Sequence, residues 1–266
     1  MDIIYEINPP KIFSDSPVIN FDKLNQEIKK FLVRTKMILE HVNSLHITDS
    51  VLGIPRISSI HAASLILENI TNQKINISCS VRTRDRNIIS IIQFVTRAVS
   101  LNIKDLLFVL GDSPQIHPDS KYLQILSKPT DTINTLNSFG YNKFINLNLS
   151  IPNKISNHNN FNKKINSNPY GMITQSINSL KEIKELNSLI KNHSIKLIPC
   201  VMVPSDKNIK AAKMIGLDWK EYKDNFTRFV EMIGCYSDNV LISSPNDFYG
   251  GMEMLKDLKD KKIISF

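Results

Sequence analysis

The chain has 266 residues, of which 42% are hydrophobic, so one large α/β domain or two small ones can bury a substantial core. Its formal net charge is +8, but the lysines are scattered without interleaved aromatics, which favours solvated faces over a nucleic-acid-binding surface. The sequence contains no run of 18 uninterrupted apolar residues, so a transmembrane helix is not expected. The stretch MDIIYEINPPK lacks the basic region and the apolar region that follow one another in a signal peptide.

Short apolar, β-branched runs alternate with longer helical patterns along the chain. The predicted strands are 2–7, 44–48, 75–81, 105–110, 144–149, 171–175, 195–203 and 239–244. The helical segments between them include 22–42, 58–69, 86–101, 179–192 and 219–233. Residues 142–169 are rich in asparagine, and their middle, NKISNHNNFN, has no clear period and is predicted to be a loop.

Eight strand–helix units predict a (β/α)8 TIM barrel, forming a single domain over residues 1–266. The alternative is a doubly wound open sheet. Such a sheet usually carries a glycine-rich phosphate-binding turn after its first strand, whereas here the first strand is followed by NPPK. The barrel is therefore the favoured architecture.

Polar residues follow several of the predicted strands at their carboxyl ends, where barrel enzymes carry their active sites. Glu6, Thr48, Asp112 and Gln175 hold such positions, and the barrel hypothesis expects them to converge. Each also has a plainer interpretation as a cap or turn residue. Asp112 lies in GDSP, a good turn former, and Glu6 could pair with a lysine.

The cysteines and histidines do not indicate a metal site. The three cysteines are far apart, which excludes a CxxC site and a disulfide framework and is consistent with a reducing cytoplasm. Five of the six histidines lack metal-ligand spacing and are interpreted as core, helix or loop residues: His46, His61, His117, His158 and His193. The segment RTRDR, residues 82–86, could hold a phosphate or form salt bridges at the rim.

Several stretches resemble, in order, the methylenetetrahydrofolate reductase family in its short single-domain form: EINPPK, LHITDSVLGIPRIS, RTRDRN, LLFVLGDSP, KINSNPYGMITQ and IPCVMVPSDKNIKAAKMIG. The resemblance runs from about residue 3 to about residue 220. It implies a TIM barrel that binds FAD and reduces 5,10-methylenetetrahydrofolate to the 5-methyl form. It also implies an oxidoreductase acting on CH–NH donors, in one-carbon metabolism and methionine biosynthesis.

The resemblance also implies roles for individual residues. Glu6 matches the general acid that assists opening of the substrate ring, and a raised pKa would suit that task. Asp112 matches the aspartate that stabilises the iminium ion. Gln175 matches a folate-binding glutamine. The residues that would contact the flavin are Thr48, Ser80, Arg84, Asp112 and Lys164, with Lys164 suited to the diphosphate.

Other positions depart from the family pattern. Ser80 stands where the family has a histidine, and Leu110 where it has an arginine. Ala211 and Ile215 replace residues that contact substrate or nicotinamide, so the electron donor is left open between NAD(P)H and an electron-delivering partner protein. Two alternatives follow: an accessory barrel subunit that works with a partner, or a flavin-free enzyme acting on a C1-pterin. A homo-oligomer that binds neither nucleic acid nor membrane is expected.

Overall fold

The computed structural model describes residues 1–13, 18–115 and 127–263. Its eight strands are arranged in the order β1 to β8 in a closed barrel, and β1 pairs with β8, β3 with β4, β5 with β6, β6 with β7 and β7 with β8 in parallel. The prediction of a (β/α)8 barrel is confirmed, and the open doubly wound sheet is wrong. His117 lies outside the described residues.

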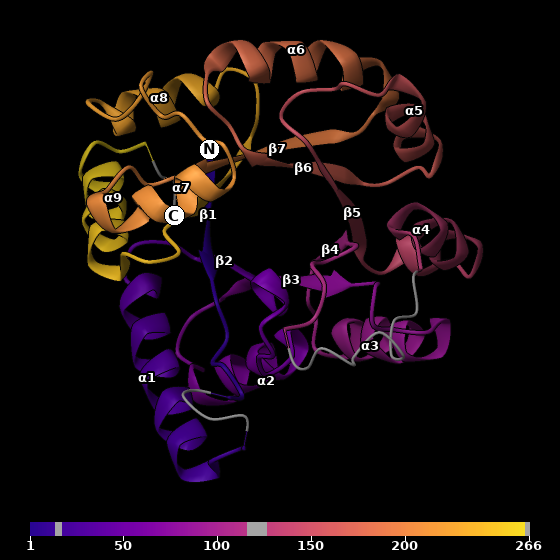
Figure 1. The fold of residues 1–266 in the computed structure, drawn as a ribbon, viewed down its shortest axis with the longest axis vertical. Coiled ribbons are helices and arrows are strands. Elements are labelled where there is room, and N and C mark those ends of the chain that lie inside the picture. Colours follow the sequence, from indigo (N-terminus) through magenta and orange to yellow (C-terminus); the bar gives the residue numbers. More distant parts are fainter. Residues whose placement is uncertain (14–17, 116–126, 264–266) are drawn as a thin grey trace. The chain divides into compact units, whose positions relative to one another are not determined.

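The strands and helices alternate along the chain (Figure 1). The strands are β1 (Asp2–Ile7), β2 (Ser44–Ile47), β3 (Asn76–Arg82), β4 (Asp105–Val109), β5 (Asn146–Ile151), β6 (Gly171–Ser176), β7 (Lys196–Met202) and β8 (Asn239–Ser243). The α-helices are α1 (Phe21–Leu39), α2 (Ser59–Asn69), α3 (Ile88–Ser100), α4 (Pro129–Ser138), α5 (His158–Asn166), α6 (Leu180–Ile190), α7 (Ile209–Met214), α8 (Phe226–Ile233) and α9 (Phe248–Asp260). Short 3₁₀ turns are η1 (Val51–Gly53), η3 (Tyr141–Lys143), η4 (Lys191–His193) and η5 (Asp206–Asn208).

The chain forms two compact units. Unit 1 comprises residues 1–6, 38–45 and 148–266, and unit 2 comprises residues 7–37 and 46–147. The extent of the predicted single domain, residues 1–266, stays a prediction.

Unit 1 contains a parallel sheet in which β5, β6, β7, β8 and β1 lie side by side in that order. Leu241 of β8 is the partner of both Cys200 and Ile4, which fixes the register of β7 and β1. Helix α6 packs on β7 and on α8, and α8 packs on α9. The ring of Tyr222 stacks on that of Phe229 at 4.5 Å, so an aromatic pair anchors α8 in the core.

Unit 2 is built around the parallel pair β3 and β4, whose register runs from Ser78↔Asp105 to Arg82↔Val109. Helix α2 packs on β3 and on α3, and α4 packs on β4. Two N-caps set the helix starts: Ser58 accepts a hydrogen bond from the His61 amide, and Asn87 accepts one from the Ser90 amide. These caps satisfy amide groups that have no partner within the helix.

Several sequence-based boundaries differ from the structure, and the helix predicted over residues 22–42 ends at Leu39. The loop predicted within NKISNHNNFN is partly helix, because the Asn157 side chain caps α5 by accepting from the Asn160 amide, and Phe161 supplies a buried anchor. Strand β5 begins two residues later than expected, and Phe144, which the prediction placed in it, is 71% exposed. Helix α8 begins at Phe226, not at residue 219.

Two glycines of unit 2 allow a matched test of backbone packing. Gly53 and Gly140 both have positive φ, +71° and +80°, but a Cβ on Gly53 would overlap the carbonyl oxygen of Ser113, whereas nothing lies within 4 Å at Gly140. Gly140→Ala should cost about 1–2 kcal/mol of unfolding free energy from left-handed strain alone. Gly53→Ala should cost clearly more, as measured by urea denaturation. Equal losses would contradict the close approach at Gly53.

Candidate active site

The carboxyl group of Glu6 lies in unit 1 at the carboxyl end of β1 and is half-buried. Ser243, the last residue of the neighbouring β8, donates a hydrogen bond of 2.6 Å from its Oγ to Glu6 Oε1. Burial raises the pKa of Glu6, and the hydrogen bond from Ser243 offsets this only in part. A carboxyl group with a raised pKa at a barrel strand end is a candidate for proton transfer.

The residue before Glu6 supports the strand from the opposite side, because successive side chains of a strand point to opposite faces. The Tyr5 hydroxyl is hydrogen-bonded to Ser244, and a Cβ on Gly251 would overlap that hydroxyl. Asn208 donates from Nδ2 to the Ser244 Oγ and to the Val203 carbonyl, both at 3.0 Å. These contacts join β1 to the ends of β7 and β8, so the Glu6 carboxyl is held on a rigid support.

Cys200 of β7 is close enough to Glu6 for the carboxyl charge to affect the pKa of its thiol. Its Sγ is 3.7 Å from the Ser176 Oγ, and the side chain is buried. Burial raises the pKa of Cys200 to about 12, and the neighbouring Glu6 adds to this effect. The thiol therefore stays protonated at neutral pH. Since the thiolate is the nucleophilic form of cysteine, Cys200 is not a candidate nucleophile.

Lys164 and Gln175 complete the predicted residues of unit 1. The Lys164 Nζ donates a hydrogen bond to the carbonyl oxygen of Ser150, near the carboxyl end of β5, and burial lowers the pKa of this amine. Gln175 is exposed near the end of β6. Ile151 of β5 is paired with Thr174 of β6, so the ends of these two strands lie side by side.

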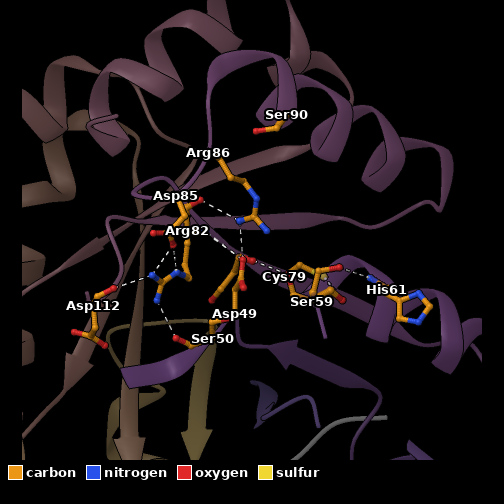
Figure 2. Close-up of polar contacts among 12 residues, drawn as sticks. Asp49, Ser50, Ser59, His61, Cys79, Arg82, Asp85, Arg86, Ser90 and Asp112 are labelled. Atoms are coloured by element: carbon orange, nitrogen blue, oxygen red, sulfur yellow. Dashed lines mark hydrogen bonds and ion pairs between the residues drawn. The ribbon is translucent and has the colours of Figure 1, made fainter. Parts of the chain in front are cut away.

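In unit 2 the guanidinium group of Arg82 joins three loops that follow β2, β3 and β4 (Figure 2). It donates to the carbonyl oxygen of Ser50 at 2.9 Å and to that of Asp112 at 2.7 Å. It also donates from Nε and Nη2 to Asp85 Oδ2, at 2.8 and 2.5 Å. Since its side chain is only 4% exposed, Arg82 is a buried cation with every nitrogen bonded to protein.

A second ion pair in unit 2 joins Arg86 to Asp49, with 2.7 Å between Nη1 and Oδ2 (Figure 2). The same nitrogen donates to the carbonyl oxygen of Arg82 at 3.0 Å. Of the two interpretations of RTRDR, the structure therefore shows salt bridges at Arg82 and Arg86. Guanidinium groups already paired with carboxylates are poorly suited to holding a phosphate.

Ser80 and Thr48 are bonded inside unit 2. The imidazole of His46 lies between two hydroxyls of β3, with its Nδ1 2.7 Å from Ser78 Oγ and its Nε2 2.9 Å from Ser80 Oγ. Burial lowers the pKa of His46 to about 4, so the ring is neutral. The Thr48 hydroxyl donates to the side chain of Asn8 at 2.7 Å.

Asp112 and Arg84 take part in the loop after β4. The Asp112 side chain is exposed, while its carbonyl oxygen accepts from Arg82. Arg84 donates from Nε to the carbonyl oxygen of Gly111 at 3.0 Å. Of the four residues expected to converge, Glu6 and Gln175 belong to unit 1, whereas Thr48 and Asp112 belong to unit 2.

Within residues 1–13, 18–115 and 127–263, no three or more His, Cys, Asp or Glu side chains are grouped so that they could hold a metal ion. In the same ranges no helix has the length and apolar character needed to cross a membrane.

No protein-family model matches the sequence, and no curated protein matches it. Among solved structures, the chain is similar to "QR15, an Aldolase", with a TM-score of 0.53 and 10% sequence identity. The similarity covers 99% of this chain and 96% of that chain. At this identity, the similarity shows a shared barrel fold.

These comparisons correct the assignment made from sequence motifs. Membership of the methylenetetrahydrofolate reductase family is wrong, because no family model matches and the similar structure is an aldolase. Flavin-dependent reduction of a methylene-pterin, its place in one-carbon metabolism and methionine biosynthesis, and FAD as cofactor are wrong with it. The accessory-subunit and flavin-free pterin alternatives gain no support. The expected homo-oligomer stays a prediction.

Three of the residues that the resemblance placed beside a flavin have hydrogen-bond partners within the protein. The hydroxyls of Thr48 and Ser80 are bonded to Asn8 and His46. The Lys164 amine is bonded to the carbonyl oxygen of Ser150 in its own unit.

The sequence predicted Glu6 as a site residue. It did not predict that Ser243 donates to Glu6 in unit 1, or that Arg82 is the buried arginine that joins three loops in unit 2. The signal for Ser243 was its place at the end of the last predicted strand, the same kind of position that drew attention to Glu6. Arg82 lay inside a segment considered as a whole, and nothing in the letters RTRDR distinguishes the buried arginine from its neighbours.

Glu6→Gln should stabilise the protein at high pH. The pKa of Glu6 is higher in the folded chain than in the unfolded chain. Ionisation of Glu6 therefore lowers the unfolding free energy, because the folded chain then holds a desolvated charge. The gain in unfolding free energy of Glu6→Gln over the natural chain should therefore grow as the pH rises above 4.5, the ordinary pKa of this side chain. Asp2→Asn, at the exposed start of the same strand, serves as the control. A gain independent of pH would contradict the raised pKa.

His46 should make stability depend on pH in the opposite direction. Its folded pKa of about 4 lies below the usual 6.5, so the unfolded chain binds the extra proton and stability falls as the pH drops below 6.5. This group should contribute a loss of about 2 kcal/mol between pH 7 and pH 5. The loss should be absent from His46→Gln and retained in the exposed-site control His61→Gln, as measured by urea denaturation.

Proposed function

We propose that this chain is an enzyme that makes or breaks a carbon–carbon bond by aldol chemistry, with Glu6 as its proton-transfer group. The observation that carries the proposal is the desolvated carboxyl of Glu6, held by Ser243 at the carboxyl edge of the unit 1 sheet. That edge is where barrel enzymes perform their chemistry. The similarity to a solved aldolase supplies the reaction class.

Aldol cleavage needs a group that both accepts and donates a proton. The hydroxyl proton of a β-hydroxy carbonyl compound must leave as the carbon–carbon bond breaks, which releases an aldehyde and an enolate. The enolate carbon must then receive a proton. A carboxyl group with a raised pKa can perform both steps, because its two protonation states are then closer in free energy near neutral pH. Ser243 orients the carboxyl by donating to Oε1.

The proposal is tested by incubating the purified chain with a panel of β-hydroxy aldehydes and ketones and measuring aldehyde release as a hydrazone. Glu6→Gln keeps an oxygen that can accept from Ser243 but removes the transferable proton. Its kcat should fall by about 10²–10⁴-fold, the usual contribution of general acid–base catalysis.

Asp2→Asn removes a carboxylate from the same strand at its exposed start and should leave turnover unchanged. Melting temperatures measured alongside exclude unfolding as the cause of a loss. The proposal is wrong if no compound in the panel is cleaved above the buffer rate, or if Glu6→Gln retains full kcat.

A further inference from the structure

Unit 2 contains a row of two serines and a histidine that the proposed aldol function does not use. His46 of β2 lies between two hydroxyls of the neighbouring β3, with its Nε2 2.9 Å from Ser80 Oγ and its Nδ1 2.7 Å from Ser78 Oγ. Both distances are those of hydrogen bonds. A hydroxyl bonded to a base, with the base oriented by a third group, is the arrangement that activates a serine for nucleophilic attack.

The neutral state of the His46 ring fixes the role of each hydroxyl. Burial lowers the pKa of His46 to about 4, so at neutral pH one ring nitrogen carries a hydrogen and the other has a free electron pair. The nitrogen with the free pair must accept from one serine, and the other nitrogen must donate to the second serine. One serine is therefore the candidate nucleophile, and the other holds the ring in place.

The positions of the two serines along β3 distinguish them. Ser80 is two residues before Arg82, which ends the strand, whereas Ser78 is paired with Asp105, the first residue of β4. Barrel enzymes carry their reacting groups at the carboxyl ends of strands. Ser80 is therefore the nucleophile, with its hydroxyl donating to Nε2, and Ser78 accepts from Nδ1.

The surroundings of Ser80 hold it in place and limit what reaches it. The Cys79 Sγ is 3.7 Å from the carbonyl oxygen of Ser59 in α2, so Ser80 faces away from that helix, because successive side chains of a strand alternate. The Ser59 hydroxyl donates to the Ser80 carbonyl oxygen at 2.7 Å, which fixes the backbone. Since Ser80 is only 6% exposed, its hydroxyl is open to a small acyl group and closed to a long one.

We propose that Ser80 is the nucleophile of a second activity, the hydrolysis of esters with a short acyl chain, with His46 as its general base and Ser78 as a positioning residue. Ser80 Oγ bonds to the ester carbonyl carbon while His46 Nε2 takes the hydroxyl proton. The bond between that carbon and the alcohol oxygen then breaks, and Nε2 gives the proton to the leaving oxygen. Water attacks the acyl-serine next. Its proton passes through Nε2 to Ser80 Oγ, and the carboxylic acid is released.

Trapping of the serine tests this inference independently of aldol turnover. Phenylmethanesulfonyl fluoride transfers its sulfonyl group to an activated serine oxygen and loses fluoride, and tandem mass spectrometry locates the added mass. Most of the label formed at short times should lie on Ser80, although Ser100 at the end of α3 is more exposed. Ser100→Ala should keep the label and Ser80→Ala should lose it. His46→Gln should slow labelling by about 10²–10⁴-fold, the usual contribution of a general base.

Hydrolysis of p-nitrophenyl acetate and p-nitrophenyl octanoate, followed as nitrophenolate release, tests turnover and the acyl-chain limit. The acetate should be hydrolysed faster, and Ser80→Ala should lose this activity. Ser78→Ala should slow hydrolysis, whereas Ser78→Thr, which keeps the hydroxyl, should restore it. Melting temperatures measured alongside show which variants are folded.

A label spread over exposed serines, or no label on Ser80, would overturn the inference. So would labelling at the natural rate in folded His46→Gln, or equal hydrolysis by Ser80→Ala and the natural chain. If His46→Gln does not fold, the result with Ser80→Ala decides. None of these outcomes affects the proposed aldol function, because that function rests on Glu6 of unit 1.

Discussion

Polar groups at the carboxyl end of a parallel strand must form hydrogen bonds with protein or with solvent. The two units meet this constraint differently. In unit 1, Glu6 and Lys164 are desolvated and bonded to uncharged partners, so burial shifts both towards their neutral forms. In unit 2, Arg82 and Arg86 are paired with Asp85 and Asp49. Carboxyl and amine groups with shifted pKa values are candidates for proton transfer, whereas paired ions hold loops in place.

The sequence was sufficient for the architecture and for one residue of the candidate site. Eight apolar runs with helical segments between them are a periodic signal, and the strand-end rule then selects Glu6. Helix α5 was hidden because asparagine has weak helix propensity, so its capping by Asn157 is decided by local geometry. The inward turn of Lys164 was also hidden, because sequence does not show which of two adjacent lysines faces a neighbouring strand.

Two of the motifs that suggested a folate enzyme contain a glycine whose backbone has a positive φ in this fold. The glycine of GDSP, Gly111, has a φ of +83° and lies against the side chain of Arg82. The glycine of VLGIP, Gly53, has a φ of +71° and lies against the Ser113 carbonyl. Such turns recur wherever strands end at a crowded edge, because glycine alone adopts them without strain. These short motifs therefore indicated the turns that follow the strands of the barrel, and they did not indicate the reaction.

The guanidinium of Arg82 has a consequence for the kinetics of unit 2. Because it bonds the carbonyls of Ser50 and Asp112 and the carboxylate of Asp85, no one of these three loops can detach without leaving a buried cation partly unpaired. Local unfolding of the three loops is therefore cooperative. The backbone amides around Ser50, Asp85 and Asp112 should exchange with solvent together, at a rate set by the opening of the whole cluster.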